Sequence, residues 1–194
     1  MTDRAEIRPV VPGSGPMWRR AFAEALGTGG LVTVVIGSGI MAERLSPGDV
    51  GVQLLENAVA TAAGLVVLIL VFGPVSGAHL NPVVSIVDWA MGRTKRTGLR
   101  GRDLVVYVPA QLAGGVGGAV LANVMFALPP VGVSGKDRSA GHLWLAEVVA
   151  TAGLVIVIFA LTRTGRARLA PAAVGAYIGA AYWFTSSTSF ANPA

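Results

Sequence analysis

The sequence has no cysteine and only two histidines, His79 and His142, among its 194 residues. It therefore offers neither a disulfide nor a thiolate ligand, and its histidines form no cluster with metal-ligand spacing. Charged residues are also scarce, at 13% of the chain. No nucleophile, base and orienting residue group together, and no phosphate-binding motif occurs. These absences predict a protein that is not an enzyme and needs no metal or other cofactor.

Apolar residues are abundant instead. They make up 53% of the sequence, and 26 residues are glycine, a balance typical of membrane proteins. They form five blocks, several of which approach the roughly 20 residues needed to cross a bilayer, and we expect each block to be a transmembrane helix. The blocks cover residues 21–42, 54–72, 104–128, 143–162 and 169–185. Because such blocks recur to the end of the chain, the first is expected to be structural rather than a cleaved signal peptide.

The basic residues behind the net charge of +5 are unevenly distributed. The segment before the first block and the linkers after the second and fourth blocks hold four, five and three of them, which leaves three for the other two linkers. Basic linkers are retained on the cytoplasmic side of a membrane. The sequence therefore predicts a multi-pass cell-membrane protein with a cytoplasmic tail over residues 1–20. Nucleic acid is not an expected partner, because no basic stretch is interleaved with stacking aromatic residues.

The first and fourth blocks are similar in sequence. Residues 23–36 read AEALGTGGLVTVVI and residues 146–159 read AEVVATAGLVIVIF, with seven identities in fourteen positions. Glu24 matches Glu147, and a carboxylate inside a span is costly unless it has a partner. Three spans separate the copies, so the second copy enters the membrane from the opposite side. We expect inverted repeats over about residues 21–128 and, incompletely, about 143–194.

An Asn-Pro pair follows the second span of each repeat: Asn81-Pro82 within VSGAHLNPVVS and Asn192-Pro193 within STSFANPA. Asparagine is a favoured N-cap and proline suits the first helical turn, so each pair predicts a short re-entrant helix that starts inside the membrane. Two such helices would meet end to end, with both asparagines and both positive helix ends facing the centre. This arrangement predicts passage of neutral solutes and exclusion of protons. Either pair alone could instead be an ordinary loop turn.

Together these residues resemble the major intrinsic protein family, the aquaporins and glycerol facilitators. SGAHLNPVVS and FANPA are similar to its two signature loops, and AEALGT and AEVVAT to its first and fourth helices. The resemblance covers about residues 24–194. It implies an all-α membrane protein, an aquaporin-like bundle of inverted repeats with six spans and two re-entrant half-helices, usually a homotetramer. The chain would hold five of the six spans, and the second half-helix and sixth span would be missing.

Two departures from the family pattern concern the signature motifs. The third residue of the first motif is Val83, where the family usually has alanine, and valine adds two methyl groups near the expected narrowing. The second motif ends at Ala194, the last residue of the chain, before the position that commonly holds an arginine at the selectivity constriction.

The resemblance also implies roles for individual residues. Glu24 and Glu147 would anchor the re-entrant loops through backbone groups, although a carboxylate near a helix end can also reach the interface. His79 could line the cytoplasmic half of the pore or only fix the loop. Spacing from the signature asparagines, as in the family, places three residues at the selectivity constriction: Thr61, Ala180 and Ser189.

The expected function is a channel for passive permeation of water or small uncharged solutes. Thr61 and Ala180 would leave a wide constriction that glycerol could pass, and residues 182–194 are similar to a bacterial branch of the family associated with uncharged metalloid acids. One alternative is an inactive fragment or assembly partner, because a bundle without one span cannot close its pore wall. A more distant one is a secondary transporter, whose midplane site normally gathers ion-coordinating groups. The expected partners are the bilayer, neutral solutes and further copies of the chain.

Overall fold

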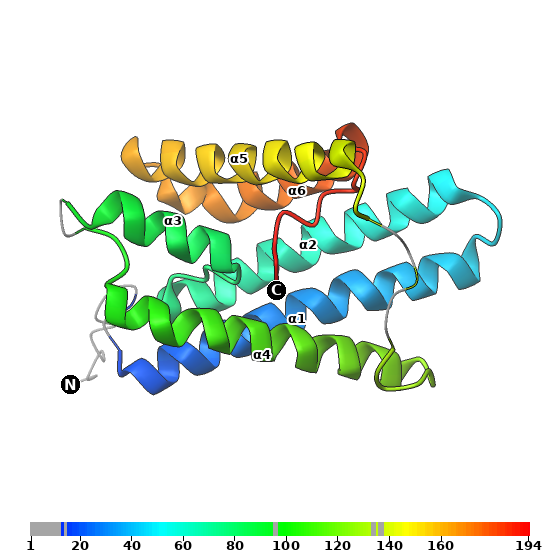
Figure 1. The fold of residues 1–194 in the computed structure, drawn as a ribbon, viewed down its shortest axis with the longest axis horizontal. Helices are drawn as coiled ribbons and strands as arrows, with labels where there is room; N and C mark the ends of the chain where they lie inside the picture. Colours follow the sequence, from blue (N-terminus) through cyan, green and yellow to red (C-terminus); the bar gives the residue numbers. More distant parts are fainter. Residues whose placement is uncertain (1–12, 14, 95–96, 133–134, 136–137) are drawn as a thin grey trace, which may run out of the picture.

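The computed structural model describes residues 13, 15–94, 97–132, 135 and 138–194. These residues form six α-helices and one short 3-10 helix, η1 (Figure 1), which confirms the predicted all-α class. The elements are α1 (Met17–Leu45), α2 (Val50–Ser76), α3 (Pro82–Gly92), α4 (Gly101–Met125), α5 (Gly141–Arg163), η1 (Ala167–Leu169) and α6 (Ala170–Phe184).

Four of these helices are long and apolar enough to cross a membrane: α1, α2, α4 and α5. α1 begins at Met17 and so includes the end of the expected tail, of which residues 1–12 and 14 lie outside the described part of the chain. The fifth expected span is the exception. α6 has 15 residues, which reach only about 22 Å. It stops at Phe184 because Thr185 is extended and the chain turns back toward the centre of the molecule.

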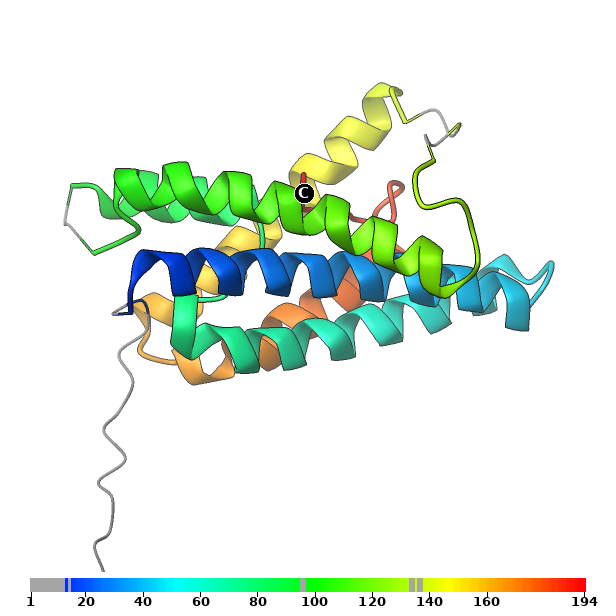
Figure 2. The ribbon, with the colours of Figure 1, turned by 90° about the horizontal axis from the view of Figure 1, so that it is seen from below.

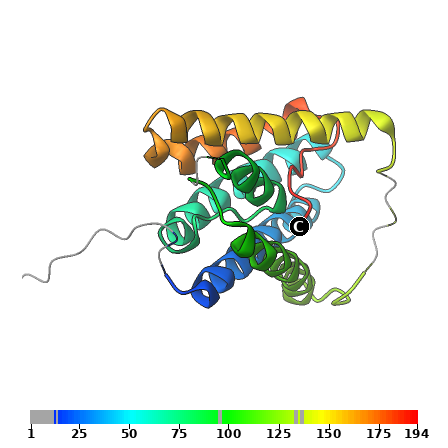
Figure 3. The ribbon, with the colours of Figure 1, turned by 60° about the vertical axis from the view of Figure 1, so that its left-hand side comes forward.

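α1, α2 and α4 run roughly along the longest axis of the molecule, and α5 crosses them obliquely (Figures 1 and 2). Successive long helices run in opposite directions (Figure 1). α1 packs against α2 and α4, while α6 packs against α2 and α5. The short helix α3 begins near the middle of the molecule and contacts α4 on one side and α5 on the other (Figure 3). The C-terminus also lies midway along the long helices (Figure 1).

One end of the molecule carries most of the basic linkers. The start of α1, the α3–α4 linker and the α5–α6 turn lie together there, and we call it the basic end (Figure 1). Its described basic residues include Arg20, Arg100 and Arg166. The α1–α2 and α4–α5 linkers lie at the opposite end. Linkers rich and poor in basic residues alternate along the sequence, and this alternation corresponds to the two ends of the molecule.

α1 and α4 touch through their backbones. A Cβ atom at Gly114 would collide with the carbonyl oxygen of Ala25, and one at Gly118 with that of Gly29. The Thr33 hydroxyl donates to the carbonyl oxygen of Gly118 at 3.1 Å. Small residues permit this close approach in lipid, where packing replaces the hydrophobic effect as the force between helices. The contact holds α4 within reach of the polar residues of α1 described below.

This contact predicts different effects on stability for substitutions at two adjacent glycines. We expect Gly118→Ala to lower the thermal unfolding temperature of the purified protein in detergent, because forcing α4 away from α1 costs about 1–3 kcal/mol. Gly117 has open space around its Cβ position. Gly117→Ala should therefore leave that temperature unchanged or raise it slightly, because alanine is the better helix former by roughly 0.5–1 kcal/mol. Equal effects of the two substitutions would contradict the packing described here.

Candidate functional site

Both asparagines of the Asn-Pro motifs cap the backbone that follows them. Asn81 Oδ1 accepts a hydrogen bond from the amide of Val83 at 2.9 Å, and Pro82 is the first residue of α3. Asn192 Oδ1 accepts in the same way from the amide of Ala194 at 3.0 Å. The caps satisfy amides that a helix start leaves without partners. In the described part of the chain a helix follows the first cap, while the second lies at the end of the sequence.

The side-chain amides of the two asparagines link the two loops to each other. Asn81 Nδ2 donates to the carbonyl oxygen of Ala191 at 2.6 Å, and Asn192 Nδ2 donates to that of Leu80 at 2.8 Å. Each asparagine thus binds the residue that precedes the other. Because an amide nitrogen carries two hydrogens, these bonds leave each asparagine one further N–H donor.

The two loops also share an unusual backbone conformation. Non-glycine residues one and three positions before each asparagine have left-handed φ angles of 47–52°: Ala78, Leu80, Ser189 and Ala191. This conformation costs roughly 1–2 kcal/mol for each such residue, so other contacts must hold the loops. One is a serine in each loop: the Ser76 hydroxyl accepts from the amide of Ala78 at 3.1 Å, and the Ser187 hydroxyl from that of Ser189 at 3.2 Å.

Glu24 provides the main support of the first loop. Its side chain is completely buried, and its two carboxylate oxygens accept four hydrogen bonds. The donors are Ser76 Oγ at 2.6 Å, His79 N at 3.0 Å, Leu80 N at 2.7 Å and Gln111 Nε2 at 2.7 Å. These bonds compensate for the cost of taking a carboxylate out of water. Glu24 therefore joins α1, the end of α2, the first loop and α4.

Glu147 does the same for the second loop. Its carboxylate accepts from the amides of Phe190 at 3.1 Å and Ala191 at 2.8 Å. These are the two residues before Asn192, as His79 and Leu80 are the two before Asn81. Both glutamates thus bind their loops through backbone amides, which favours the anchoring interpretation over a carboxylate that reaches the interface.

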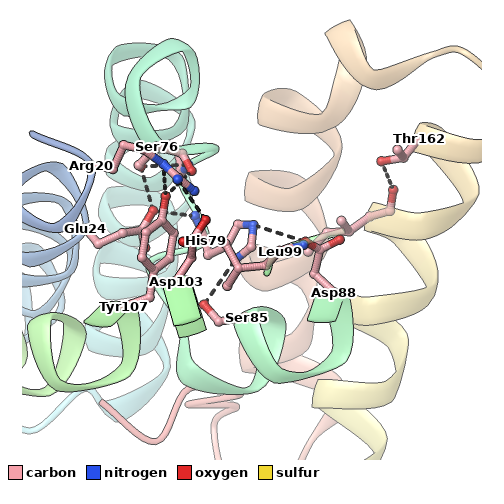
Figure 4. Close-up of polar contacts among 12 residues, drawn as sticks. Arg20, Glu24, Ser76, His79, Ser85, Asp88, Leu99, Asp103, Tyr107 and Thr162 are labelled. Atoms are coloured by element: carbon pink, nitrogen blue, oxygen red, sulfur yellow. Dashed lines mark hydrogen bonds and ion pairs between the residues drawn. The ribbon is translucent and has the colours of Figure 1, made fainter. Parts of the chain in front are cut away.

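A second group of polar residues lies toward the basic end (Figure 4). Arg20 forms an ion pair with Asp103 at 2.9 Å, and its Nε donates to the Tyr107 hydroxyl at 3.0 Å. The Tyr107 hydroxyl in turn donates to the carbonyl oxygen of Ser76 at 2.7 Å. The start of the first loop is therefore fixed to α1 and α4 on its outer side as well.

His79 lies between this group and the half-helix α3 (Figure 4). Its Nδ1 is 3.0 Å from the Ser85 hydroxyl, and its Nε2 is 3.8 Å from Asp88 Oδ2. The same Asp88 oxygen accepts from the amide of Leu99 in the α3–α4 linker at 2.7 Å. His79 thus contacts α3 from the first loop, and it also lines the cavity described next. Its position is therefore compatible both with fixing the loop and with lining a pore.

A cavity of about 240 Å³ lies against both asparagines. Most of its wall is apolar and comes from α2, α5 and α6, for example Leu65, Leu154 and Ile178. A second cavity, of about 740 Å³, lies at the basic end and is mostly polar. Three residues line both cavities: Gly77, His79 and Asp88. The two cavities therefore adjoin beside the first loop.

The expected constriction residues do not all lie at the cavity of about 240 Å³. Thr61 and Ser189 line it and are almost completely buried. Ala180 is exposed and does not line it, whereas Ile178 and Tyr182 of the same helix do. Residues four apart share a helix face, and the residue midway between them points away. The position that faces the cavity is therefore displaced by two residues from the one that motif spacing gives.

Val83 also differs from expectation. It is partly exposed and does not line the cavity, while the next residue, Val84, is buried and does. Successive side chains on a helix point about 100° apart, so only one of the two faces the cavity. The methyl groups that valine adds to the motif therefore do not narrow this cavity.

Sequence reasoning missed three residues of the site: Tyr182, Asp88 and Gln111. Gln111 had a signal, because an amide within an apolar block needs a buried partner. Asp88 is likewise a carboxylate in an apolar half-helix. The only sequence signal for Tyr182 was its spacing of four residues from Ile178. This spacing places the two residues on one face of the helix but does not show whether that face lines a cavity or packs against another helix.

The role of Glu24 can be tested by Glu24→Gln. The side-chain amide of glutamine would turn a donor toward groups that are themselves donors, so we expect a loss of roughly 2–5 kcal/mol and a lower thermal unfolding temperature. Glu43→Gln, an exposed change on the same helix, is the matched control and should have little effect. If both variants unfolded at the same temperature, Glu24 would not be the support of the loop.

Comparison with known proteins identifies the family. The family model described as "Major intrinsic protein" matches residues 13–194. The aquaglyceroporin AqpS of Rhizobium meliloti (strain 1021) is 53% identical over 176 residues, which cover 91% of this chain and 72% of that protein. The glycerol uptake facilitator protein of Pseudomonas aeruginosa is 33% identical over 209 residues, which cover 92% of this chain and 71% of that protein.

The fold is also that of a solved member. The crystal structure of the aquaglyceroporin from Plasmodium falciparum matches with a TM-score of 0.69 and 22% sequence identity, covering 89% of this chain and 76% of that one. The shared fold agrees with the helical bundle described above, and the family predicted from the two signature loops is confirmed. The family model spans residues 13–194, and the two relatives are matched over 72% and 71% of their own length. The chain therefore belongs to the major intrinsic protein family.

Proposed function

We propose that the protein is a transmembrane channel for the passive permeation of water and small uncharged solutes such as glycerol. The observation that supports this most is the pair of reciprocally bonded asparagines beside a largely apolar cavity. Asn81 and Asn192 each keep one N–H donor, and most of the surrounding wall is apolar. A water molecule that accepts from both would have its oxygen held at this point and could not pass a proton along a hydrogen-bonded file.

The same geometry disfavours ions. α3 begins at Pro82 beside the cavity, so the positive end of its dipole, about half an elementary charge, faces the centre. A cation would meet this field after losing its hydration shell, and an anion would find no lysine or arginine among the described residues that line this cavity. Proton and ion exclusion at the paired motifs therefore belongs to the proposal.

Thr61 and Ser189 are proposed constriction residues, with Ile178 and Tyr182 in place of Ala180 on α6. The small side chain of Thr61 leaves room for a glycerol-sized molecule, and an uncharged metalloid acid of similar size is a further candidate solute. The relatives named for glycerol support a polyol more directly.

The membrane arrangement follows from the basic end. We assign this end to the cytoplasm because basic linkers are retained there, which places the N-terminus inside the cell and the protein in the cell membrane. The cavity at the basic end would then be the cytoplasmic entrance, with His79 and Asp88 at its inner limit. A homotetramer with one pore in each subunit remains the expected assembly.

The channel can be tested in proteoliposomes by stopped-flow light scattering. Vesicles with the protein should shrink and reswell faster than protein-free vesicles in water and glycerol gradients, while an internal pH dye reports no added proton flux. Val84→Trp, which places a large ring in the cavity, should return both fluxes close to the protein-free level. Ile86→Trp, on the exposed side of the same half-helix, should not.

The outcomes separate the alternatives. Uptake that saturates and depends on a proton or sodium gradient would favour a transporter. If vesicles with the protein gave no flux above that of protein-free vesicles, the alternative of an inactive fragment or assembly partner would be favoured.

A further inference from the structure

We infer that Tyr182 determines which neutral solutes pass, because its hydroxyl acts with that of Thr61 as a hydrogen-bonding pair for small polyols. This inference rests on the proposed channel function and adds to it a residue that motif spacing does not identify. It concerns the discrimination between solutes, not the existence of the channel.

The two hydroxyls meet at the cavity wall. Thr61 belongs to α2 and Tyr182 to α6, and their oxygens are 3.1 Å apart. The exposed fraction is 2% for residue Thr61 and 6% for residue Tyr182, and both residues line the cavity of about 240 Å³. The pair is therefore a polar element in a wall whose area is otherwise mostly apolar.

The backbone fixes the distance between the two hydroxyls. A Cβ atom at Gly175 of α6 would lie 2.7 Å from the carbonyl oxygen of Ala62, so α2 and α6 touch directly beside Thr61. Tyr182 follows Gly175 by seven residues, which is about two helical turns on the same face. A rigid aromatic ring on this face has little freedom to withdraw its hydroxyl from the wall.

The pair retains hydrogen-bonding capacity for a solute. Two hydroxyls carry two hydrogens and four acceptor sites, and the bond between them uses one hydrogen and one acceptor. Neither oxygen has another hydrogen bond among the described residues. One donor and several acceptors therefore remain, which suits a solute that both donates and accepts.

Ser189 provides an independent observation at the same cavity. Its Oγ is buried and has no hydrogen-bond partner in the described part of the chain, and the residue is 2% exposed. Buried polar atoms almost always have a partner, and this hydroxyl in the cavity wall is available to bond a molecule inside the cavity. Three uncharged hydroxyls thus face a solute path with apolar walls.

This lining matches the chemistry of a small polyol. Its carbon chain can contact the apolar wall while its hydroxyls exchange water for Thr61, Tyr182 and Ser189. An ion gains no opposite charge from hydroxyls. Water is less dependent on any one of them, because it also bonds to neighbouring waters in the file. Removal of one hydroxyl should therefore affect a polyol more than water.

The experiment compares the glycerol and water permeability of the protein in proteoliposomes. Tyr182→Phe keeps the ring and removes only the hydroxyl; we expect the ratio of glycerol to water permeability to fall roughly three- to tenfold, the effect of one hydrogen bond. Thr61→Val should lower the ratio similarly. The double variant should fall little further than either single one, because the two residues act as a pair.

Tyr177→Phe is the matched control. Tyr177 lies on the same helix, its hydroxyl donates to the carbonyl oxygen of Ala150 at 2.9 Å, and it does not line the cavity. Loss of the Tyr177 hydroxyl should leave the ratio of glycerol to water permeability unchanged. If Tyr182→Phe did not reconstitute, the ratio in Thr61→Val would decide, because that change removes the same hydrogen bond from the other helix.

An unchanged or higher ratio in Tyr182→Phe, or strictly additive effects in the double variant, would overturn the inference. These results leave the channel itself intact, because the wild-type protein would still conduct. A wild-type protein that conducted neither water nor glycerol would instead contradict the proposed function, and the inference with it.

Discussion

The arrangement of the two signature loops depends on two carboxylates that bind backbone amides, Glu24, which is completely buried, and Glu147, which is partly buried. Glu24 and Glu147 each hold the two residues before an asparagine, in loops whose left-handed residues would not keep this shape alone. A carboxylate in the interior of a bundle requires such donors, and the loops require such an acceptor. Each therefore stabilises the other, and the asparagines take their orientation from this interaction.

The symmetry of the site follows from the inverted repeat. Corresponding serines, glutamates and asparagines make corresponding hydrogen bonds in the two loops, although the loops differ at most other positions. The reciprocal bonds from Asn81 to Ala191 and from Asn192 to Leu80 then close the arrangement across the repeat boundary. The first loop has additional support from Gln111 and Tyr107 of α4, which the close contact between α1 and α4 brings into reach.

Much of this was predictable from the sequence, and the limits have physical causes. The spans, the repeat, the helix start at Pro82 and the importance of the two glutamates follow from lipid thickness, charge cost and capping chemistry, which depend on local composition. The cavity face of α6 does not. Motif spacing gives Ala180, but helix rotation is set by packing against α2, and it places Ile178 and Tyr182 at the cavity instead. The left-handed conformation of the four loop residues could not be predicted from the sequence either, because none of the four is glycine.

Charged side chains and uncharged polar side chains lie at different places along the molecule. This arrangement connects the fold with the proposed channel. The ion pair of Arg20 with Asp103 and the neighbouring His79 and Asp88 lie toward the basic end. At the asparagines, by contrast, the polar groups named above are amides and hydroxyls. A neutral solute exchanges water for these groups at small cost, whereas an ion would need a charge that they do not supply. In the proposed channel, selection against ions would therefore depend on what the central wall offers in place of water as much as on its width.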